Sequence, residues 1–314
     1  MSVSAVVVSW NVRDLLRQCL LSLRSAARQL PLEVCVVDNG SRDGSAAMVQ
    51  QEFPEVRLLV NSNNPGFAAA NNQALRDSRS EYVLLLNPDA ELGTGALATL
   101  CRYLDCHPQV AIVGPQLCND DGSVQSSRRR APRLATGFLE STQLQQRLPR
   151  TWLTDYYYVA DRSDAEEQPV DWLMGACLLV RRSAINAVGL LDERFHMYSE
   201  ELEWCLRFRR AGWEIVYVPA AQVVHHSGQS SGQDVLQRHL HHHQSKYRLY
   251  ALLFGKPAAT LLRLWIGLLY LAQFAEELAK LALLRRNRAM RRQRLRVLVR
   301  MLLWHAVGRR ALAP

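Results

Sequence analysis

The sequence predicts an α/β fold in which a mostly parallel sheet is covered by helices on both faces. Short apolar runs alternate with segments of helical periodicity through residues 3–113, at the spacing of βαβ units. Polar residues stand directly after several of these apolar runs. The chain of 314 residues is 48% hydrophobic, which is enough for one large domain with an appendage or for two domains.

The elements of the N-terminal half follow from this alternation. Residues 3–9 form a continuous apolar run, as expected of a buried strand, and residues 12–28 place leucines and Cys19 at helical spacing. Further strands are predicted at residues 33–38, 56–60, 82–86 and 110–113. Further helices are predicted at residues 45–51, 67–77 and 95–106.

The pattern changes after residue 118. Residues 119–122 read Asn-Asp-Asp-Gly, which is the signal of a hairpin turn. Residues 126–164 are polar, arginine-rich and aromatic without a clear period, so we predict a long flexible loop or lid. Later strands are predicted at residues 170–180 (interrupted by Gly175), 214–218 and 222–225, and later helices at 198–211 and 235–253.

The net charge of +9 is concentrated at the C-terminus. No acidic residue follows Glu277, whereas Lys280 and ten arginines do. The preceding residues carry 27 Lys and Arg against 29 Asp and Glu, a net charge of −2. A near-neutral body argues against a nucleic-acid-binding protein, and the basic tail indicates a local anionic surface as its partner.

The apolar stretch at residues 261–284 is interrupted by Arg263, Glu276, Glu277 and Lys280. Its longest uncharged run, residues 264–275, is shorter than the roughly 20 residues of a spanning helix, so a transmembrane segment is disfavoured. A helix lying in the membrane interface beside an arginine-rich partner fits better. Packing of these helices against a second copy stays open as an alternative.

The cysteines indicate a reducing compartment. Seven of them are scattered along the chain with no C-x-x-C pair, which is typical of buried thiols rather than of a disulfide framework or a zinc site. The N-terminus enters the first strand without a basic segment, so we expect no signal peptide. Both observations favour a cytoplasmic protein.

Polar side chains at strand ends are the first candidate site residues, because ligands of open α/β sheets bind beyond the carboxyl ends of the strands. Asp38 ends the second predicted strand, and Asp89 follows the fourth in an Asn-Pro-Asp turn. An aspartate there can accept hydrogen bonds from a base or ribose, or offer a hard oxygen to Mg²⁺ or Mn²⁺. Asn64 and Gly66 open a helix of small residues that a phosphate could approach. Each segment could also be an ordinary turn or helix cap.

The second half adds three polar groups. Glu200, Glu201 and Glu203 surround a helix start, where acidic residues are also favoured for structural reasons. His225 and His226 end a strand, and a histidine there can bind a metal or a phosphate or be merely structural. The predicted lid carries four arginines that could close over a diphosphate or form a solvated charge run, namely Arg128, Arg129, Arg130 and Arg133.

Taken in order, seven segments resemble the inverting family 2 glycosyltransferases of the GT-A fold, in the rhamnosyltransferase-like branch that assembles bacterial cell-surface polysaccharides. Their order and spacing together are specific, and they lie within residues 3–250. The segments are VVVSWN (6–11), VDNGSRDGS (37–45), NPGF (64–67), NPDA (87–90), GACLLVRR (175–182), YSEELE (198–203) and HHSGQS (225–230).

The resemblance implies a donor site in the first half. Asp38 would bind the nucleotide base, and Ser9 and Asn11 would line the same pocket. Asp89 would hold a divalent metal, Mg²⁺ or Mn²⁺, that bridges the donor's diphosphate. The remaining donor-binding candidates are Asn64, Gly66 and Asn87. Asn87 stands where many relatives have a second carboxylate, so metal binding would depend mainly on Asp89.

The resemblance also implies an acceptor side. Glu201 matches the family's catalytic base, which is more often Asp, and Glu200 would position the helix or the acceptor. His225 would be a further metal or diphosphate contact. The candidates for the acceptor or diphosphate are completed by Gly175, Ala176, Arg128 and Arg129.

The implied activity is transfer of a sugar, with rhamnose favoured, from a dTDP- or UDP-linked donor to a glycan or a polyprenyl-diphosphate-linked acceptor. The implied location is the inner face of the plasma membrane. We expect a glycosyltransferase domain at residues 1–250, with a donor half (1–115) and an acceptor half (116–250), followed by a basic amphipathic helical tail at 251–314.

Two other functions are weighed against this one. A nucleotidyltransferase that makes activated sugars would need a glycine-rich loop after the first strand, where this chain has Ser9-Trp10-Asn11. A catalytically degenerate protein that only binds nucleotide-sugars, or a membrane-associated interaction protein, would not need to retain Asp38, Asp89 and Glu201. Both functions are therefore disfavoured.

Overall fold

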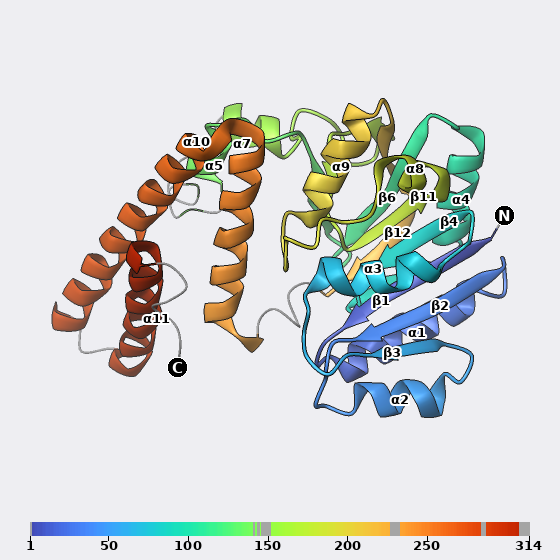
Figure 1. Ribbon diagram of the computed structural model, residues 1–314, viewed down its shortest axis with the longest axis horizontal. Coiled ribbons are helices and arrows are strands. Elements are labelled where there is room, and N and C mark those ends of the chain that lie inside the picture. Colours follow the sequence, from blue (N-terminus) through green and yellow to red (C-terminus); the bar gives the residue numbers. More distant parts are fainter. Residues whose placement is uncertain are drawn as a thin grey trace. The chain divides into compact units, whose positions relative to one another are not determined.

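The computed structural model describes residues 2–140, 142, 145, 152–226, 233–283 and 287–307. The chain divides into two compact units, drawn in Figure 1. Met1–Ala131 and Asp155–Gln233 form the first, here called the sheet unit, and Pro132–Thr154 and Asp234–Pro314 form the second, the helical unit. The division of the chain at residue 250 stays a prediction.

The sheet unit is built on one mixed sheet, visible at the centre of that unit in Figure 1. Its main path runs β3 (Arg57–Val60), β2 (Leu32–Asp38), β1 (Val3–Ser9), β4 (Tyr82–Leu86), β11 (Cys177–Arg181), β6 (Val110–Cys118), β12 (Glu214–His225) and β5 (Ala90–Leu92). The strands β3, β2, β1 and β4 are parallel, as predicted. β11 is antiparallel to both of its neighbours, and β12 is parallel to β6.

The strand register brings the polar strand ends together. Ser9 pairs with Asp38 across β1 and β2, so both side chains stand at the same edge of the sheet. Cys177 pairs with Leu86, which places the segment before β11 beside the Asn-Pro-Asp turn that follows β4. His225 pairs with Ala90, next to Asp89. Residues far apart in the sequence therefore meet at one edge.

Helices cover both faces of this sheet. α1 (Arg13–Ala26), α2 (Ser45–Glu52) and α4 (Ala96–Cys106) share one hydrophobic cluster with the strands. α1 contributes a buried stripe at helical spacing, Leu16, Cys19, Leu20 and Leu23, and each fully buried leucine stabilises the fold by roughly 1.5–3 kcal/mol. α3 (Phe67–Asp77) packs on β1 and β2 with residues outside that cluster.

The structure adds elements that the sequence did not predict. The short strand β5 and the helix α8 (Arg182–Val188) were not expected. The predicted strand at 170–180 is interrupted and forms β10 (Trp172–Leu173) and β11, whereas the predicted strands at 214–218 and 222–225 are one strand, β12, with a register shift between Val218 and Gln222. α9 (Glu200–Arg210) begins two residues later than predicted.

The predicted loop at 126–164 contains regular structure. It holds β8 (Arg128–Arg129), which pairs with β10, and the helices α5 (Thr136–Leu139) and α7 (Trp152–Tyr157). Part of the segment lies outside the described residues. The predicted hairpin at 119–122 is confirmed, because β6 pairs with β7 (Val124–Gln125) in antiparallel fashion. β9 (Gln168–Pro169) pairs with β12.

The helical unit contains two long helices, α10 (Val235–Leu283) and α11 (Arg288–Val307). α10 is kinked at Gly255, whose φ of 86° and ψ of 162° are not helical, just before Pro257. Between the helices lies a cluster that includes Leu262, Ile266 and Met301. Among the described residues, one helix is long and apolar enough to cross a membrane by length and composition alone. It is α10, with an 18-residue window of mean hydropathy 1.4.

Candidate active site

Asp38 and Ser9 form a buried polar pair at the ends of β2 and β1. Their exposed fractions are 1% and 0%. Asp38 Oδ1 accepts a hydrogen bond from the Ser41 N–H at 2.9 Å, whereas Asp38 Oδ2 and Ser9 Oγ find no partner among the described residues. A buried polar atom without a partner costs about 1–3 kcal/mol, so this pair is prepared for a ligand that donates hydrogen bonds.

Asn11 shapes the loop beside this pair. Its φ is 53°, its N–H donates to Ser41 Oγ at 2.9 Å, and its Oδ1 accepts from the Arg42 N–H at 2.7 Å. These bonds fix residues 39–44 over the end of β1. Asn11 therefore lies beside Asp38, as expected, but its side-chain oxygen already accepts a hydrogen bond from the loop.

Gly66 joins the donor half of the sheet unit to the segment before α9. Its φ is 98°, and a Cβ at this position would lie 2.4 Å from the backbone oxygen of His196, so only glycine fits. The Phe67 N–H donates to the same oxygen at 2.7 Å. Asn64 Oδ1 accepts hydrogen bonds from Gly66 N–H and Asn39 Nδ2. His196 was not predicted, and nothing in its sequence context signals this contact.

Asp89 and His225 come together at the ends of β4 and β12. Each is 5% exposed, and the His225 Nε2 lies 3.4 Å from Asp89 Oδ1. Asn87 Nδ2 lies 3.4 Å from the same ring nitrogen. The structure therefore brings the two predicted metal ligands and the predicted donor contact into one group.

A residue that sequence reasoning missed, Gln125 of β7, orients the imidazole of His225. Gln125 Nε2 donates to the His225 backbone oxygen at 2.5 Å and to Asn119 Oδ1 at 2.7 Å. These two acceptors turn Gln125 Oε1 toward His225 Nδ1, at 2.9 Å. This arrangement assigns the ring hydrogen to Nδ1, so the Nε2 lone pair faces Asp89, which is how second-shell partners prepare metal-binding histidines.

These residues fit a hard divalent cation that shares its coordination with a ligand. Within the described ranges no group of three or more His, Cys, Asp or Glu side chains could hold a metal. Mg²⁺ and Mn²⁺ commonly take one or two protein ligands and complete their shell with water and substrate phosphates. The pair of Asp89 and His225 suits that kind of site better than a structural zinc centre.

Glu201 stands in the first turn of α9, behind a strained backbone. Tyr198 and Ser199 have φ values of 69° and 67°, a conformation that costs non-glycine residues of order 1 kcal/mol each. Gly175 lies against the Glu201 side chain, 3.5 Å from its Cβ and Cγ as measured from an ideal Cβ on the glycine. Residues with such strain cluster at functional sites, and here they fix where α9 begins.

The two neighbouring glutamates differ in electrostatics. Burial raises the pKa of Glu200 well above its ordinary value, and the charge of Glu201 raises it further. Burial also raises the pKa of Glu201, while N–H groups of Gly175 and Leu202 and the Arg129 guanidinium oppose this. Glu201 is therefore the member of the pair that ionises first, which suits a proton acceptor at neutral pH.

The backbone connects the metal pair to Glu201. The Asn87 N–H donates to the Ala176 backbone oxygen at 2.9 Å, and Ala176 is 2% exposed. Gly175, the next residue, contacts Glu201. Gly175 and Ala176 thus lie between the two chemical groups, where the sequence predicted an acceptor border.

Two of the four predicted lid arginines, Arg128 and Arg129, behave differently. Arg128 is 4% exposed, pairs with Asp164 and donates to the Ser163 backbone oxygen at 3.0 Å, so its guanidinium is committed away from the site. Arg129 is close enough to Glu201 to lower the pKa of that carboxyl, and its guanidinium lies 4.4 Å from the ring centre of Tyr158. Of these two, Arg129 is the one that lies near Glu201.

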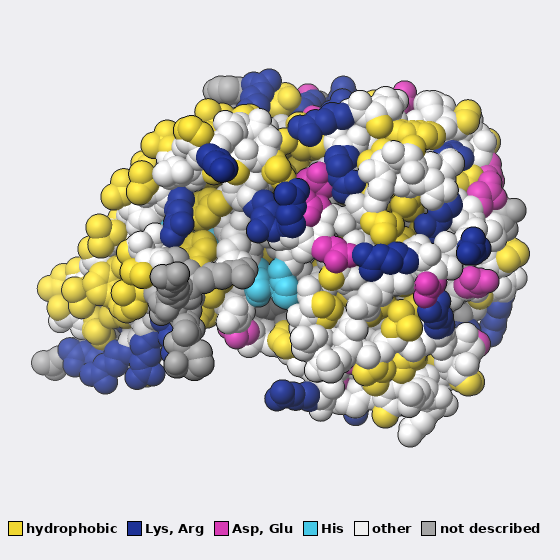
Figure 2. Space-filling view, viewed as in Figure 1, with side chains coloured by type: hydrophobic (Ala, Val, Ile, Leu, Met, Phe, Trp, Pro, Cys, Tyr) yellow, Lys and Arg dark blue, Asp and Glu magenta, His cyan; other side chains and the backbone are white. Residues whose placement is uncertain are grey.

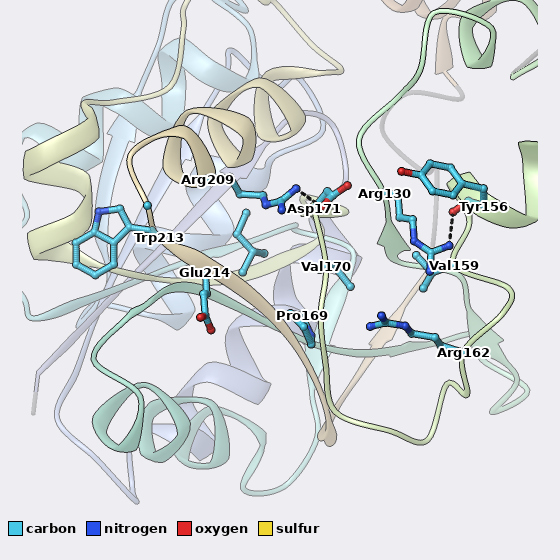
Figure 3. A pocket seen from close by; sticks show the side chains of 12 residues that line it. Arg130, Tyr156, Val159, Arg162, Pro169, Val170, Asp171, Arg209, Trp213 and Glu214 are labelled. Carbon is cyan, nitrogen blue, oxygen red and sulfur yellow. Dashed lines mark hydrogen bonds and ion pairs between the residues drawn. The ribbon is translucent and has the colours of Figure 1, made fainter.

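A separate pocket of about 420 Å³ lies at the far end of the same elements (Figure 3). Arg209, at the end of α9, and Glu214, at the start of β12, line this pocket. Glu201 stands at the other end of α9, and His225 stands at the other end of β12. Arg209 pairs with Asp171, and Arg130 donates to the Tyr156 backbone oxygen. Arg130 and Arg209 are thus engaged structurally, and the pocket lies away from Glu201 and His225, so it is not part of the candidate site.

The amino-acid sequence of this chain is similar to those of known proteins. Residues 4–189 match Glycosyl transferase family 2. The chain is 37% identical over 254 residues to an N-acetylglucosaminyl-diphospho-decaprenol L-rhamnosyltransferase of Mycobacterium tuberculosis, covering 77% of this chain and 81% of that protein. It is 29% identical over 174 residues to the rhamnosyltransferase WbbL of Escherichia coli, covering 52% of this chain and 61% of the relative.

A solved structure agrees in fold. The mannosyltransferase PcManGT of Pyrobaculum calidifontis, in complex with GDP-Man and Mn²⁺, superposes with a TM-score of 0.51 at 18% identity, covering 97% of this chain and 86% of that one. With the family match and the identity to the mycobacterial enzyme, this confirms the predicted family and fold: the chain belongs to glycosyl transferase family 2 and is a glycosyltransferase of the GT-A fold.

Proposed function

We propose that this glycosyltransferase moves rhamnose from a dTDP- or UDP-linked donor to a polyprenyl-diphosphate-linked acceptor, with inversion at the anomeric carbon and with a divalent cation. The observation that carries the proposal is the convergence of Asp38, Asp89, His225 and Glu201 at one edge of the sheet. The named activities of the mycobacterial and E. coli relatives favour rhamnose, and the mycobacterial name favours a lipid-linked acceptor.

The base would bind at Asp38. Uracil and thymine present the same imide N–H, and Asp38 Oδ2 is a buried acceptor without a partner among the described residues. Ser9 Oγ, which also lacks one there, would serve a carbonyl oxygen of the base. The two bases present the same edge to this pair, so the pocket fits dTDP and UDP alike.

Asp89 and His225 would hold the cation. When bound, Mg²⁺ or Mn²⁺ neutralises charge that develops on the leaving nucleoside diphosphate. Gln125 keeps the His225 lone pair directed toward Asp89, and Asn87 lies beside both. This chain would therefore supply two metal ligands rather than a complete coordination shell.

Glu201 would act as the base. Its carboxylate takes the proton of an acceptor hydroxyl while that hydroxyl oxygen bonds to the anomeric carbon and the diphosphate leaves. A single displacement of this kind inverts the configuration. Glu200, whose ionised form is disfavoured by burial, would position the start of α9.

A donor screen tests the proposal. The purified protein is incubated with a panel of dTDP-, UDP- and GDP-sugars, with Mg²⁺, Mn²⁺ or EDTA, and the released nucleoside diphosphate is measured. We expect cation-dependent turnover of a dTDP- or UDP-linked rhamnose, and an inverted product with an N-acetylglucosamine-diphosphate-polyprenol acceptor by NMR. Turnover of GDP-sugars alone, or full activity in EDTA, would refute the base or metal assignment.

The proposed location is the inner face of the plasma membrane, as a peripheral protein. The acceptor in the mycobacterial relative's name is decaprenol-linked, and a polyprenyl acceptor for this chain would require it to work at a membrane surface. The C-terminal excess of arginine is consistent with an anionic leaflet. Association of two copies through the C-terminal helices is the competing use of the same segment.

A further inference from the structure

α10 carries an exposed apolar face after its kink. Five leucines along it are exposed by 50% to 62%: Leu261, Leu264, Leu268, Leu271 and Leu278. On the other side of the helix, Leu262, Ile266 and Tyr270 are buried in the cluster shared with α11. Figure 2 shows hydrophobic side chains gathered along the outer edge of the helical unit. The helix is therefore apolar on two faces, and one of them has no partner in the described part of the chain.

The exposed face is broad and uncharged. Between residues 257 and 283 every exposed position is apolar except Thr260, and at 100° per residue these positions span an arc of about 140°. The charged residues of this stretch lie outside that arc and are engaged. Glu276 pairs with Lys280 at 2.6 Å, Glu277 pairs with Arg291 at 3.1 Å, and Arg263 donates to the His305 backbone oxygen at 2.8 Å.

α11 supplies exposed positive charge in the same unit. Its exposed arginines are Arg288, Arg292, Arg294, Arg296 and Arg300. None of the 20 residues of α11 is acidic. Figure 2 shows Lys and Arg side chains gathered at one end of the helical unit, next to the apolar edge. An uncharged apolar face beside a cluster of arginines is the composition of a helix that lies in the interface of an anionic bilayer.

A second copy of the chain is the rival occupant. The exposed leucines follow a spacing of three and four residues, which would suit a coiled-coil seam. However, a two-stranded seam is narrower than this face, and the charged pair that borders it, Glu276 and Lys280, is already formed within α10. Two copies would also bring two arginine-rich tails together, whereas an anionic surface neutralises them.

We propose that the exposed leucine face of α10, with the arginines of α11, is the surface by which this enzyme binds an anionic lipid bilayer. The inference rests on the proposed membrane location and names the residues that carry it. It does not depend on the donor or on the catalytic residues, so its failure and the failure of the proposed reaction can be told apart.

Vesicle sedimentation with the full chain tests the proposal. The expected result is binding to vesicles containing phosphatidylglycerol at low salt, weaker binding at high salt and weak binding to pure phosphatidylcholine. L264E/L268E should lower the partition coefficient at least 50-fold for both kinds of vesicle. Its matched control, L21E/V124E, makes the same changes at residues exposed by 43% and 41% in the sheet unit and should bind like the parent.

The arginines are tested separately. R292Q/R296Q/R300Q should lower binding to phosphatidylglycerol vesicles by about 100-fold and leave the phosphatidylcholine result unchanged, because each arginine near an anionic surface contributes about a factor of five. The control R28Q/R79Q/R102Q removes three exposed arginines of the sheet unit and should change binding little.

Light scattering and a donor assay complete the test. Hydrolysis of a water-soluble nucleotide-sugar should be the same in L264E/L268E and the parent, which shows that the variant is folded. A parent protein that stays in the supernatant with phosphatidylglycerol vesicles at low salt would overturn the proposal. A stable dimer by light scattering that L264E/L268E dissociates, with vesicle binding unchanged, would assign the face to a second copy and also overturn it.

Discussion

The two units hold ionisable side chains in different structural surroundings. In the sheet unit, Asp38 and Asp89 stand just beyond strand ends and Glu201 in the first turn of a helix, at the edge where the strand register brings segments together. In the helical unit, the rings of His243 and His305 lie between α10 and α11, with ring centres 5.9 Å apart and near Tyr270. The first group lies where strand ends meet a helix start, whereas the second packs between two helices, so the surroundings distinguish the two groups.

Burial acts on both groups by the same physics. It raises the pKa of Glu201 and lowers the pKa of His305 to about 4, because a low-dielectric surrounding disfavours the charged form of either. At the edge of the sheet, the atoms that lack partners would bind the proposed donor. In the helical unit, the same penalty only makes stability depend on pH. The comparison predicts that changes in the first group alter activity and changes in the second alter stability.

The largest expected effect is that of Asp89→Ala. This change removes one of the two proposed metal ligands, so Mn²⁺-dependent turnover of the donor should fall by at least 10³-fold and Mn²⁺ binding measured by calorimetry should be lost. The melting temperature should change by no more than a few degrees. Asp120→Ala, which removes a largely exposed carboxylate that pairs with His226, is the control and should keep full turnover.

The next effect is that of Glu201→Gln. Removing the base should lower transfer by about 10²–10⁴-fold while donor affinity stays within a factor of three. Transfer by the parent should rise with pH through the pKa of Glu201, which burial places above its ordinary value, because only the ionised carboxylate accepts a proton.

Glu200→Gln is the matched control for that experiment. Burial and the charge of Glu201 both raise the pKa of the Glu200 carboxyl and so disfavour its ionised form, which makes a neutral amide a mild replacement. Transfer should fall less than tenfold. If Glu201→Gln keeps transfer near the parent rate, or if the two variants lose it equally, the assignment of the base is wrong.

Much of this edge could be predicted from the sequence because its residues follow local rules. Asp38, Asp89 and Glu201 adjoin apolar runs or open a helix, and polar residues at such positions are visible without a structure. What could not be predicted depends on pairing between distant segments. Gln125 meets His225 across 100 residues, through a hairpin and β12, and neither residue signals the other.

Strand direction is the other part that the sequence left open. An apolar run such as residues 177–181 is the same for a parallel and an antiparallel strand, and β11 proved antiparallel between β4 and β6. Because β11 is antiparallel to β4, the residues just before it, Gly175 and Ala176, lie at the edge beside Asn87. The predicted flexibility of residues 126–164 was wrong where Arg128 is fixed, because the ion pair with Asp164 joins two parts of the segment that its composition does not relate.

Gln125→Met should have an intermediate effect. The variant keeps the side-chain volume but no longer accepts the hydrogen of His225 Nδ1, so the imidazole loses its preferred tautomer and orientation. Mn²⁺ affinity should fall about 10–100-fold, in line with other second-shell residues, while the maximal rate at saturating Mn²⁺ recovers. Gln222→Met, on the same strand as His225, should leave Mn²⁺ affinity unchanged. Equal affinities in Gln125→Met and the parent would show that the hydrogen bond does not orient a metal ligand.

The smallest effect is expected from His305→Phe in the helical unit. Both ring nitrogens of His305 lack a partner among the described residues, so an apolar ring of similar shape should stabilise the unit by about 1 kcal/mol at pH 7.5. The folded pKa of about 4 lies below the ordinary value of 6.5, so the histidine's contribution is present above pH 6.5 and is lost as the pH falls toward 4. Thermal unfolding at pH 7.5 and 5.0 should therefore show a larger gain for the variant at pH 5.0, with donor turnover unchanged. A lower melting temperature of His305→Phe than of the parent at both pH values would contradict the comparison.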